Sequence, residues 1–135
     1  MVDPRDAVRA GYDVVARPYV TRFGSELDHK PLDRALLAWF AGLVAGAGPV
    51  ADLGAGPGQI TRHLHALGAD VFGVDLSPRM VDVARELHRD RGITFRQGDF
   101  TALDLPDASL AGVISFYAYI HVPAAGLARA FAELR

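Results

Sequence analysis

The sequence predicts an α/β fold, a Rossmann-like doubly wound parallel sheet preceded by a helical segment. Short apolar runs at 50–53, 71–74 and 93–96 alternate with segments whose apolar residues recur at helical spacing. The first run leads directly into a glycine-rich turn, and a fourth apolar run occupies 110–116. Strand–helix alternation with short connections favours right-handed crossovers between parallel strands.

The composition is that of an ordinary globular protein. A chain of 135 residues, half of them apolar, is long enough for one domain with a single core. A net charge of −2 gives no reason to expect nucleic acid or a membrane surface as partner. Without cysteine there are no disulfides and no thiolate metal sites, and no metal site is predicted. With no long apolar run and no signal-peptide pattern, a cytoplasmic location is expected.

Residues 1–46 are predicted to form a helical cap or lid, and residues 47–135 the sheet-containing core. Asp3 and Pro4 match an N-cap followed by proline at the first helical position. Pro18 is expected to divide this helical region into two short helices. Pro31 opens a further helix with an apolar stripe at i, i+3, i+4 and i+7 spacing, which we expect to pack on the sheet. That stripe comprises Leu32, Ala35, Leu36, Trp39, Phe40 and Leu43.

The core elements follow in a regular order. The strand at 50–53 leads through the glycine turn into a helix that ends near Leu67. The strand at 71–74 ends in Asp75, and Ser77-Pro78 begins a helix that Gly92 stops. The strand at 93–96 runs into a Gly-Asp pair, and the run at 110–116 is typical of a strand buried on both faces. Pro123 opens the last helix.

The glycine turn reads Asp52-Leu53-Gly54-Ala55-Gly56-Pro57-Gly58. Glycines after a strand let a ligand approach the backbone, and the following helix start offers free N–H groups. The spacing differs from the dinucleotide fingerprint, because Gln59 stands where the last glycine belongs. It is not a P-loop either, since no Gly-Lys-Ser/Thr ending follows. A nicotinamide-dependent oxidoreductase nevertheless stays open as an alternative.

Two acids are expected at the same rim as this turn. Asp75 ends the second strand, 21 residues after Gly54, close to the spacing at which a carboxylate meets a ribose diol. Asp99 follows the third strand and can accept from an adenine amine, with the Phe100 backbone N–H beside it. Leu76 and Met80 offer apolar surface for the ring. Taken singly, these acids could equally be a helix cap and a turn residue.

The turn resembles the first motif of the class I S-adenosylmethionine-dependent methyltransferases, and the resemblance extends from Val50 to about Val122. It implies a seven-stranded fold, of which four strands in the order 3-2-1-4 are present here. It also implies that S-adenosylmethionine is the cofactor, with Asp52 ordering the loop and Tyr12 or Tyr19 facing the cofactor from a lid. The remaining implied contacts are Gly54, Ala55, Gly56 and Gly58 for the methionine portion, Asp75 for the ribose, Asp99, Phe100, Leu76 and Met80 for adenine, and Ser115 at the exit of the fourth strand.

The acceptor is expected at that exit, over 115–122, and to be a small molecule. His121 could take a proton from it, although a structural histidine at a helix start is the competing interpretation. Because the family has further strands, the run at 110–116 would be an unpaired apolar edge. We expect either that the chain is a truncated piece or that a second copy covers this edge by pairing or swapping. A non-catalytic cofactor-binding remnant is a third functional alternative.

Overall fold

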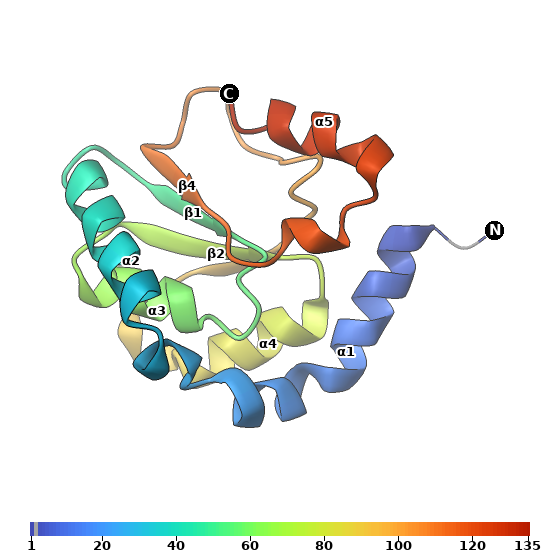
Figure 1. Ribbon diagram of the computed structural model, residues 1–135, viewed down its shortest axis with the longest axis horizontal. Coiled ribbons are helices and arrows are strands. Elements are labelled where there is room, and N and C mark those ends of the chain that lie inside the picture. Colours follow the sequence, from blue (N-terminus) through green and yellow to red (C-terminus); the bar gives the residue numbers. More distant parts are fainter. Residues whose placement is uncertain (2) are drawn as a thin grey trace.

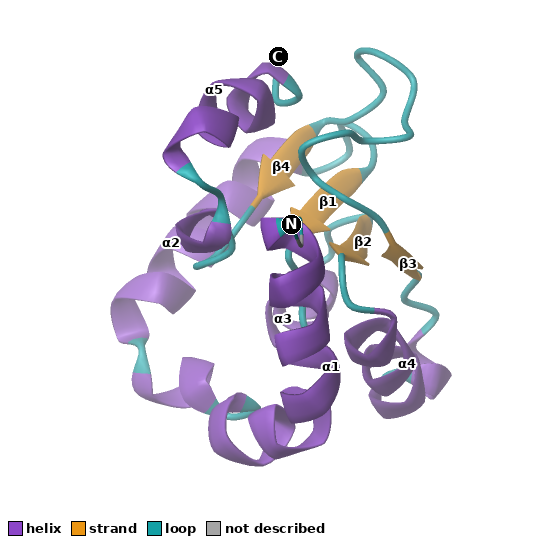
Figure 2. Ribbon diagram, turned by 90° about the vertical axis from the view of Figure 1, so that its right-hand side faces the viewer, coloured by secondary structure: helices purple, strands orange, loops and turns teal. Residues whose placement is uncertain are grey.

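The computed structural model describes residue 1 and residues 3–135; Val2, part of the predicted cap, lies outside the described residues. Four parallel strands form one sheet in the order β3-β2-β1-β4 (Figure 2), which confirms the predicted fold class and strand order. The strands are β1 (Val50–Leu53), β2 (Val71–Asp75), β3 (Phe95–Gln97) and β4 (Gly112–Ile114). The helices are α1 (Pro4–Phe23), η1 (Glu26–His29), α2 (Pro31–Val44), α3 (Gln59–Ala66), α4 (Pro78–Leu87), η2 (Arg89–Arg91), η3 (Tyr119–His121) and α5 (Ala124–Ala132).

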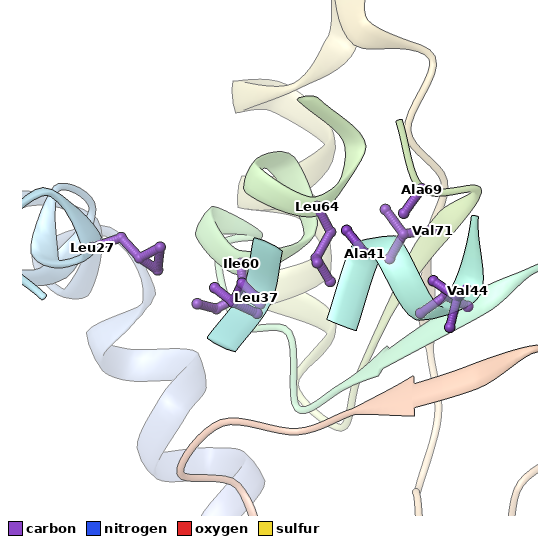
Figure 3. Packing of buried hydrophobic residues seen from close by; sticks show 9 residues of the cluster. Leu27, Leu37, Ala41, Val44, Ile60, Leu64, Ala69 and Val71 are labelled. Carbon is purple, nitrogen blue, oxygen red and sulfur yellow. The ribbon is translucent and has the colours of Figure 1, made fainter. Parts of the chain in front are cut away.

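Helices cover both faces of the sheet. In Figure 1, α2, α3 and α4 lie on one side of the strands and α5 lies on the other. Residues Leu37 of α2 and Leu64 of α3 are completely buried against Val50 and Val71, as Figure 3 shows for Leu37, Leu64 and Val71. Successive strand residues point to opposite faces, so Ala51 faces the other layer. There the loop between β3 and β4 supplies its apolar side chains, namely Phe100, Leu103, Leu105 and Leu110.

The first helix is continuous through Pro18, so the predicted division into two short helices is wrong. Proline removes one backbone hydrogen bond, which would have run to the carbonyl of Val14. Pro18 and Val14 both lie on the exposed side of α1, where water can satisfy that carbonyl. None of the described helices, this one included, is long and apolar enough to cross a membrane.

Helix α1 is held against α4. A carboxylate oxygen of Asp13 accepts hydrogen bonds from the Ser77 hydroxyl and from the Arg79 amide at the start of α4. Ala16 packs beside Met80 and Val83. The contact satisfies one free N–H group of α4, that of Arg79, and it fixes α1 beside the carboxyl end of β2.

The predicted apolar stripe of α2 is mostly wrong. Trp39 is 66% exposed, and Leu32, Leu36 and Leu43 are exposed with it. The buried face comprises Leu37, Ala41 and Val44, with Phe40 packed against it. This helix is apolar on two sides, and its contacts with α3 and β4 select the second stripe. Apart from Phe40, the first stripe remains at the surface.

Strand β4 is shorter and less buried than predicted. Only Gly112–Ile114 pair with β1, and all three residues are half-buried. Because β1 is the neighbour of β4 in this sheet and no described strand pairs with its other side, β4 forms an edge. Covering of this edge by a second copy or by further chain stays a prediction.

Candidate functional site

A cavity of about 300 Å³ lies at the carboxyl ends of the strands. This is the place where open α/β sheets bind ligands, and the volume falls at the lower end of ordinary ligand pockets. Its walls come from one side of α1, the loops after β1, β2, β3 and β4, and α5. The predicted site residues on these walls are Tyr12, Tyr19, Gly54, Gly56, Asp75, Leu76, Met80, Asp99, Phe100 and His121.

The glycine turn forms the floor with bare backbone. Gly54 and Gly56 have φ of +74° and +53°, in the left-handed region that favours glycine. A Cβ built on Gly54 would lie 2.3 Å from the Cβ of Ala118, so no side chain fits between the β1 loop and the β4 loop. Next to Gly56, in contrast, the corresponding space is open. The backbone at Gly56 is therefore accessible to a ligand.

Asp75 joins the ends of β1 and β2. One of its carboxylate oxygens accepts from the Gly56 amide at 2.8 Å, and the other accepts from the Ser77 amide at 2.9 Å. Burial raises the pKa of Asp75 above its ordinary value, while these two amide hydrogen bonds oppose the rise. A carboxylate offers about four lone-pair sites, so Asp75 can still accept two hydroxyl hydrogen bonds on the cavity side.

Asp99 is already engaged by its neighbours. Its Oδ1 accepts from the amide and the hydroxyl of Thr101 at 2.8 and 2.6 Å, and its Oδ2 accepts from Nη1 of Arg5 at 2.9 Å. Partial burial by itself would raise the pKa of Asp99, but the hydrogen bonds from Thr101 and Arg5 lower it below its ordinary value. A ligand amine that reaches this carboxylate must share Oδ2 with Arg5 or displace it.

The apolar and aromatic residues form the remaining walls. Leu76 and Met80 lie beyond Asp75, and Phe100 lies after Asp99. From α1, Tyr12 and Tyr19 face the same space with their rings 6.2 Å apart in an edge-to-face arrangement. Burial raises the pKa of both tyrosines, so their hydroxyls stay protonated near neutral pH.

His121 meets Tyr12 across the mouth of the cavity. Nε2 of His121 and the hydroxyl of Tyr12 are hydrogen-bonded at 2.5 Å, and the two rings pack edge to face. The pair connects α1 with η3, two elements separated by about a hundred residues of chain. The pair therefore joins the two elements in the wall of the cavity.

Asp52 lies behind the turn and does not line this cavity. It is 1% exposed, and its Oδ2 accepts from the Thr61 hydroxyl at 2.7 Å. Burial raises the pKa of Asp52 to about 7, the Thr61 hydrogen bond works against this, and the nearby charge of Asp75 adds to it. Asp52 and Ala55 border a second, smaller cavity of about 50 Å³ beside the first.

Asp52→Asn is expected to stabilise the fold at pH 8 by up to about 4 kcal/mol, from about three pKa units at about 1.4 kcal/mol each, with little effect at pH 4. Between the unfolded pKa near 4 and the folded pKa near 7, the folded state holds a proton that the unfolded state releases. The free energy of unfolding of the natural chain therefore falls as pH rises through this window, and asparagine has no such proton. Urea unfolding at several pH values measures the effect, with the exposed Asp104→Asn as control. An unchanged pH slope in Asp52→Asn would contradict it.

Two of the predicted residues line neither cavity. Gly58 packs beneath the turn, against the rings of Phe95 and His88. The hydroxyl of Ser115 donates to the Leu53 carbonyl at 2.8 Å and so ties β4 to β1. The sequence reasoning in turn missed Arg5 on the large cavity and Lys30 on the small one. No periodicity or motif spacing in the sequence points to either residue, because each is brought to its cavity by a contact with a residue far away in the chain.

Comparisons with known proteins define the class. The family described as "Methyltransferase domain" matches residues 50–135, more than half of the chain. The chain therefore belongs to this family, of the class I S-adenosylmethionine-dependent type that its glycine turn and strand order indicate. Within the part of the chain that the structure describes, no group of three potential metal ligands was found.

The curated relatives each match only about half of this chain. The chain is 37% identical over 73 residues to N-demethylindolmycin N-methyltransferase of Streptomyces griseus, a match that covers 53% of this chain and 31% of the relative. It is 40% identical over 79 residues to demethylmenaquinone methyltransferase of Tropheryma whipplei, covering 56% and 31%. The chain thus spans about a third of the length of these curated relatives.

A solved structure resembles nearly the whole chain. Magnesium protoporphyrin IX methyltransferase from Synechocystis PCC 6803, crystallised with bound SAM, superposes with a TM-score of 0.76 at 25% identity. The match covers 99% of this chain and 71% of that protein. The helices before β1 are therefore part of the shared architecture, as is the sheet.

Proposed function

We propose that this chain binds S-adenosylmethionine and delivers its methyl group to a small-molecule acceptor. The observation that carries the proposal is the convergence of Asp75, Asp99 and the open backbone at Gly56 on one cavity of about 300 Å³. Relatives named for indolmycin and menaquinone substrates support an acceptor of small-molecule class. A cytoplasmic location belongs to the same proposal.

The residues present fit this cofactor. On its cavity side Asp75 would accept from the ribose hydroxyls, and Asp99 would accept from the adenine amine. Leu76, Met80 and Phe100 would contact the ring. The methionine portion would pass over Gly54 and Gly56, where the space open beside the Gly56 backbone leaves room for it. Gly58 and Ser115 would then act from behind, by holding the turn and β4 in place.

When bound, the cofactor supplies a methyl group on a sulfonium, which is transferred in line to the acceptor atom. This chain's own residues contribute alignment and exclusion of water, which supply most of the acceleration in such displacements. Tyr12 and Tyr19 line the cavity, and the face of an aromatic ring attracts a cation. No other side-chain chemistry is required unless the acceptor must lose a proton.

Calorimetric titration tests the proposed cofactor. S-adenosylmethionine and its demethylated product S-adenosylhomocysteine should bind, and NAD should not. Tighter binding of NAD would overturn the proposal in favour of an oxidoreductase. Binding of both adenosyl ligands, without turnover over a broad panel of acceptors, would favour a non-catalytic module.

For acceptors that lose a proton, we propose His121 as the group that receives it, with Tyr12 as the residue that positions the imidazole. The support is the hydrogen bond between the two side chains and the place of both residues on the cavity wall. His121→Gln should lower turnover about 100-fold, the usual scale of general-base catalysis, with S-adenosylhomocysteine affinity unchanged. The exposed His65→Gln serves as control. Equal turnover of His121→Gln and the natural chain would leave His121 with the structural role instead.

A further inference from the structure

His88 is a buried histidine that lies behind the glycine turn and lines neither of the two cavities. It follows Leu87, the last residue of α4, and is 7% exposed. Its ring packs beside that of Phe95, with the ring centroids 5.6 Å apart and the planes inclined by 30°. Both rings press against Gly58, where they leave no room for a Cβ. The end of α4 and the start of β3 thus support the turn from behind.

The imidazole is joined to the turn by a hydrogen bond. Nε2 of His88 lies 3.0 Å from the carbonyl oxygen of Pro57. A carbonyl can only accept, so Nε2 carries the proton and donates it. Nδ1 is buried and has no hydrogen-bond partner among the described residues. A proton on Nδ1 would be a buried donor without an acceptor, which is costly, so the contact requires the neutral ring with its proton on Nε2.

The surroundings of His88 also favour the neutral ring. Burial lowers the pKa of His88, and the positive charges of Arg62 on α3 and Arg91 on η2 lower it further. The hydrogen bond to Pro57 acts in the opposite direction. At neutral pH the imidazole is therefore uncharged, in agreement with the single proton that the geometry assigns to it.

The hydrogen bond holds one particular peptide group of the turn. The Pro57 carbonyl and the Gly58 amide belong to the same planar peptide group. The Gly58 amide donates to the Ala55 carbonyl at 3.0 Å, so Ala55 holds one end of this group and His88 the other. Only Pro57 separates the group from Gly56, where the backbone is open to a ligand. Rotation of the group would therefore move the backbone that the ligand must approach.

We propose that His88 positions the glycine turn for the cofactor, through the hydrogen bond from its Nε2 to the Pro57 carbonyl. The inference rests on the proposed function. His88 touches no ligand in this account and acts only through the turn. In the competing account the ring merely fills the space between Gly58 and Phe95, and the donor on Nε2 has no effect on affinity.

Two substitutions of His88 separate the donor from the ring. His88→Gln loses the ring but keeps an N–H donor, because the glutamine amide nitrogen has about the reach of Nε2. His88→Phe keeps a ring beside Phe95 but leaves the carbonyl of the buried Pro57 without this donor. His88→Phe should weaken S-adenosylhomocysteine binding about tenfold, the scale of one lost hydrogen bond, and His88→Gln should stay within about threefold of the natural chain. Calorimetry measures the affinities, and the exposed His65→Gln should leave them unchanged.

The order of the two variants decides between the accounts. A larger loss of affinity in His88→Gln than in His88→Phe would overturn the inference, because the ring and not the donor would then matter. Equal affinities of the two variants would overturn it as well. Urea unfolding of both variants shows whether they are folded under the conditions of the titration.

Nitrogen NMR of the natural chain provides a test that depends on no variant's stability. At pH 7 the His88 ring, identified as the signal that His88→Phe lacks, should carry its proton on Nε2 and none on Nδ1. A proton on Nδ1 alone would overturn the inference, because Nε2 could not then donate to Pro57. If the natural chain binds no adenosyl ligand, the proposed function fails. Failure of the inference alone would instead appear in a natural chain that binds the ligand and variants that depart from the expected order.

Discussion

Asp75→Asn is expected to weaken S-adenosylhomocysteine binding roughly 1000-fold. Two hydroxyl hydrogen bonds to a charged acceptor contribute about 1.5–3 kcal/mol each, and a total near 4 kcal/mol corresponds to three decades of affinity. The substitution also acts on the turn itself. Both oxygens of Asp75 accept from backbone amides, so one of these amides would face an NH₂ group that cannot accept.

Calorimetry at fixed pH measures this loss, and thermal unfolding shows whether the variant is still folded. Asp82→Asn is the matched control. Asp82 lies on α4, the helix that follows Asp75 in the chain, and its side chain is 69% exposed. Its affinity should equal that of the natural chain. A loss below tenfold in Asp75→Asn would show that this carboxylate does not hold the ribose.

The affinity of the natural chain should also depend on pH through Asp75. Burial raises its pKa, so on acidification protons compete with the ligand hydroxyls at a higher pH than they would for an exposed aspartate. Affinity should therefore drop on acidification. Four titratable groups lie near this carboxylate, namely Asp13, Asp52, Tyr12 and Tyr19. Of these, Asp52 also titrates around pH 7 and contributes to the pH dependence there. The contribution of Asp75 to the pH dependence of affinity is the contribution that disappears in Asp75→Asn.

The strands and the rim could be predicted from sequence because each depends on local signals. The bounds of β1 were predicted correctly, and Asp75 and Asp99 were placed on one cavity because the carboxyl ends of parallel strands meet at one edge. A glycine turn between a strand and a helix carries the same kind of local information. These local signals were enough to bring most of the predicted site residues to one cavity without any knowledge of packing.

The remaining features depend on contacts that no local pattern encodes. In α2 the periodicity found an apolar stripe through Trp39, but a second stripe through Leu37 was the one that α3 buries. In α1 the effect of Pro18 depended on which side of the helix faced water. Arg5 and Lys30 reach the site from the N-terminal helices, over 94 and 87 residues of sequence separation. Only the docking of α1 and η1 brings them there.

Gly58→Ala is expected to destabilise the fold by about 4 kcal/mol. Gly58 has φ of +84°, a conformation that costs a residue with a side chain about 1–2 kcal/mol. An added Cβ would also lie 2.6 Å from Cζ of Phe95 and 3.0 Å from Cδ2 of His88. Both rings are buried, and overpacking of this kind costs a further 1–3 kcal/mol. Urea unfolding measures the sum.

Two other glycines separate backbone strain from crowding. Gly92 has φ of +71° and open space around its missing side chain, so Gly92→Ala should cost only about 1 kcal/mol. Gly56 has φ of +53° and open space on the cavity side, so Gly56→Ala should cost as little in stability but reduce ligand affinity. If Gly58→Ala were as mild as Gly92→Ala, crowding against Phe95 would be refuted as the reason for glycine at this position. Two glycines of one turn are thus required for different reasons. Gly58 is constrained by the core beneath it, and Gly56 by the ligand that must pass above it.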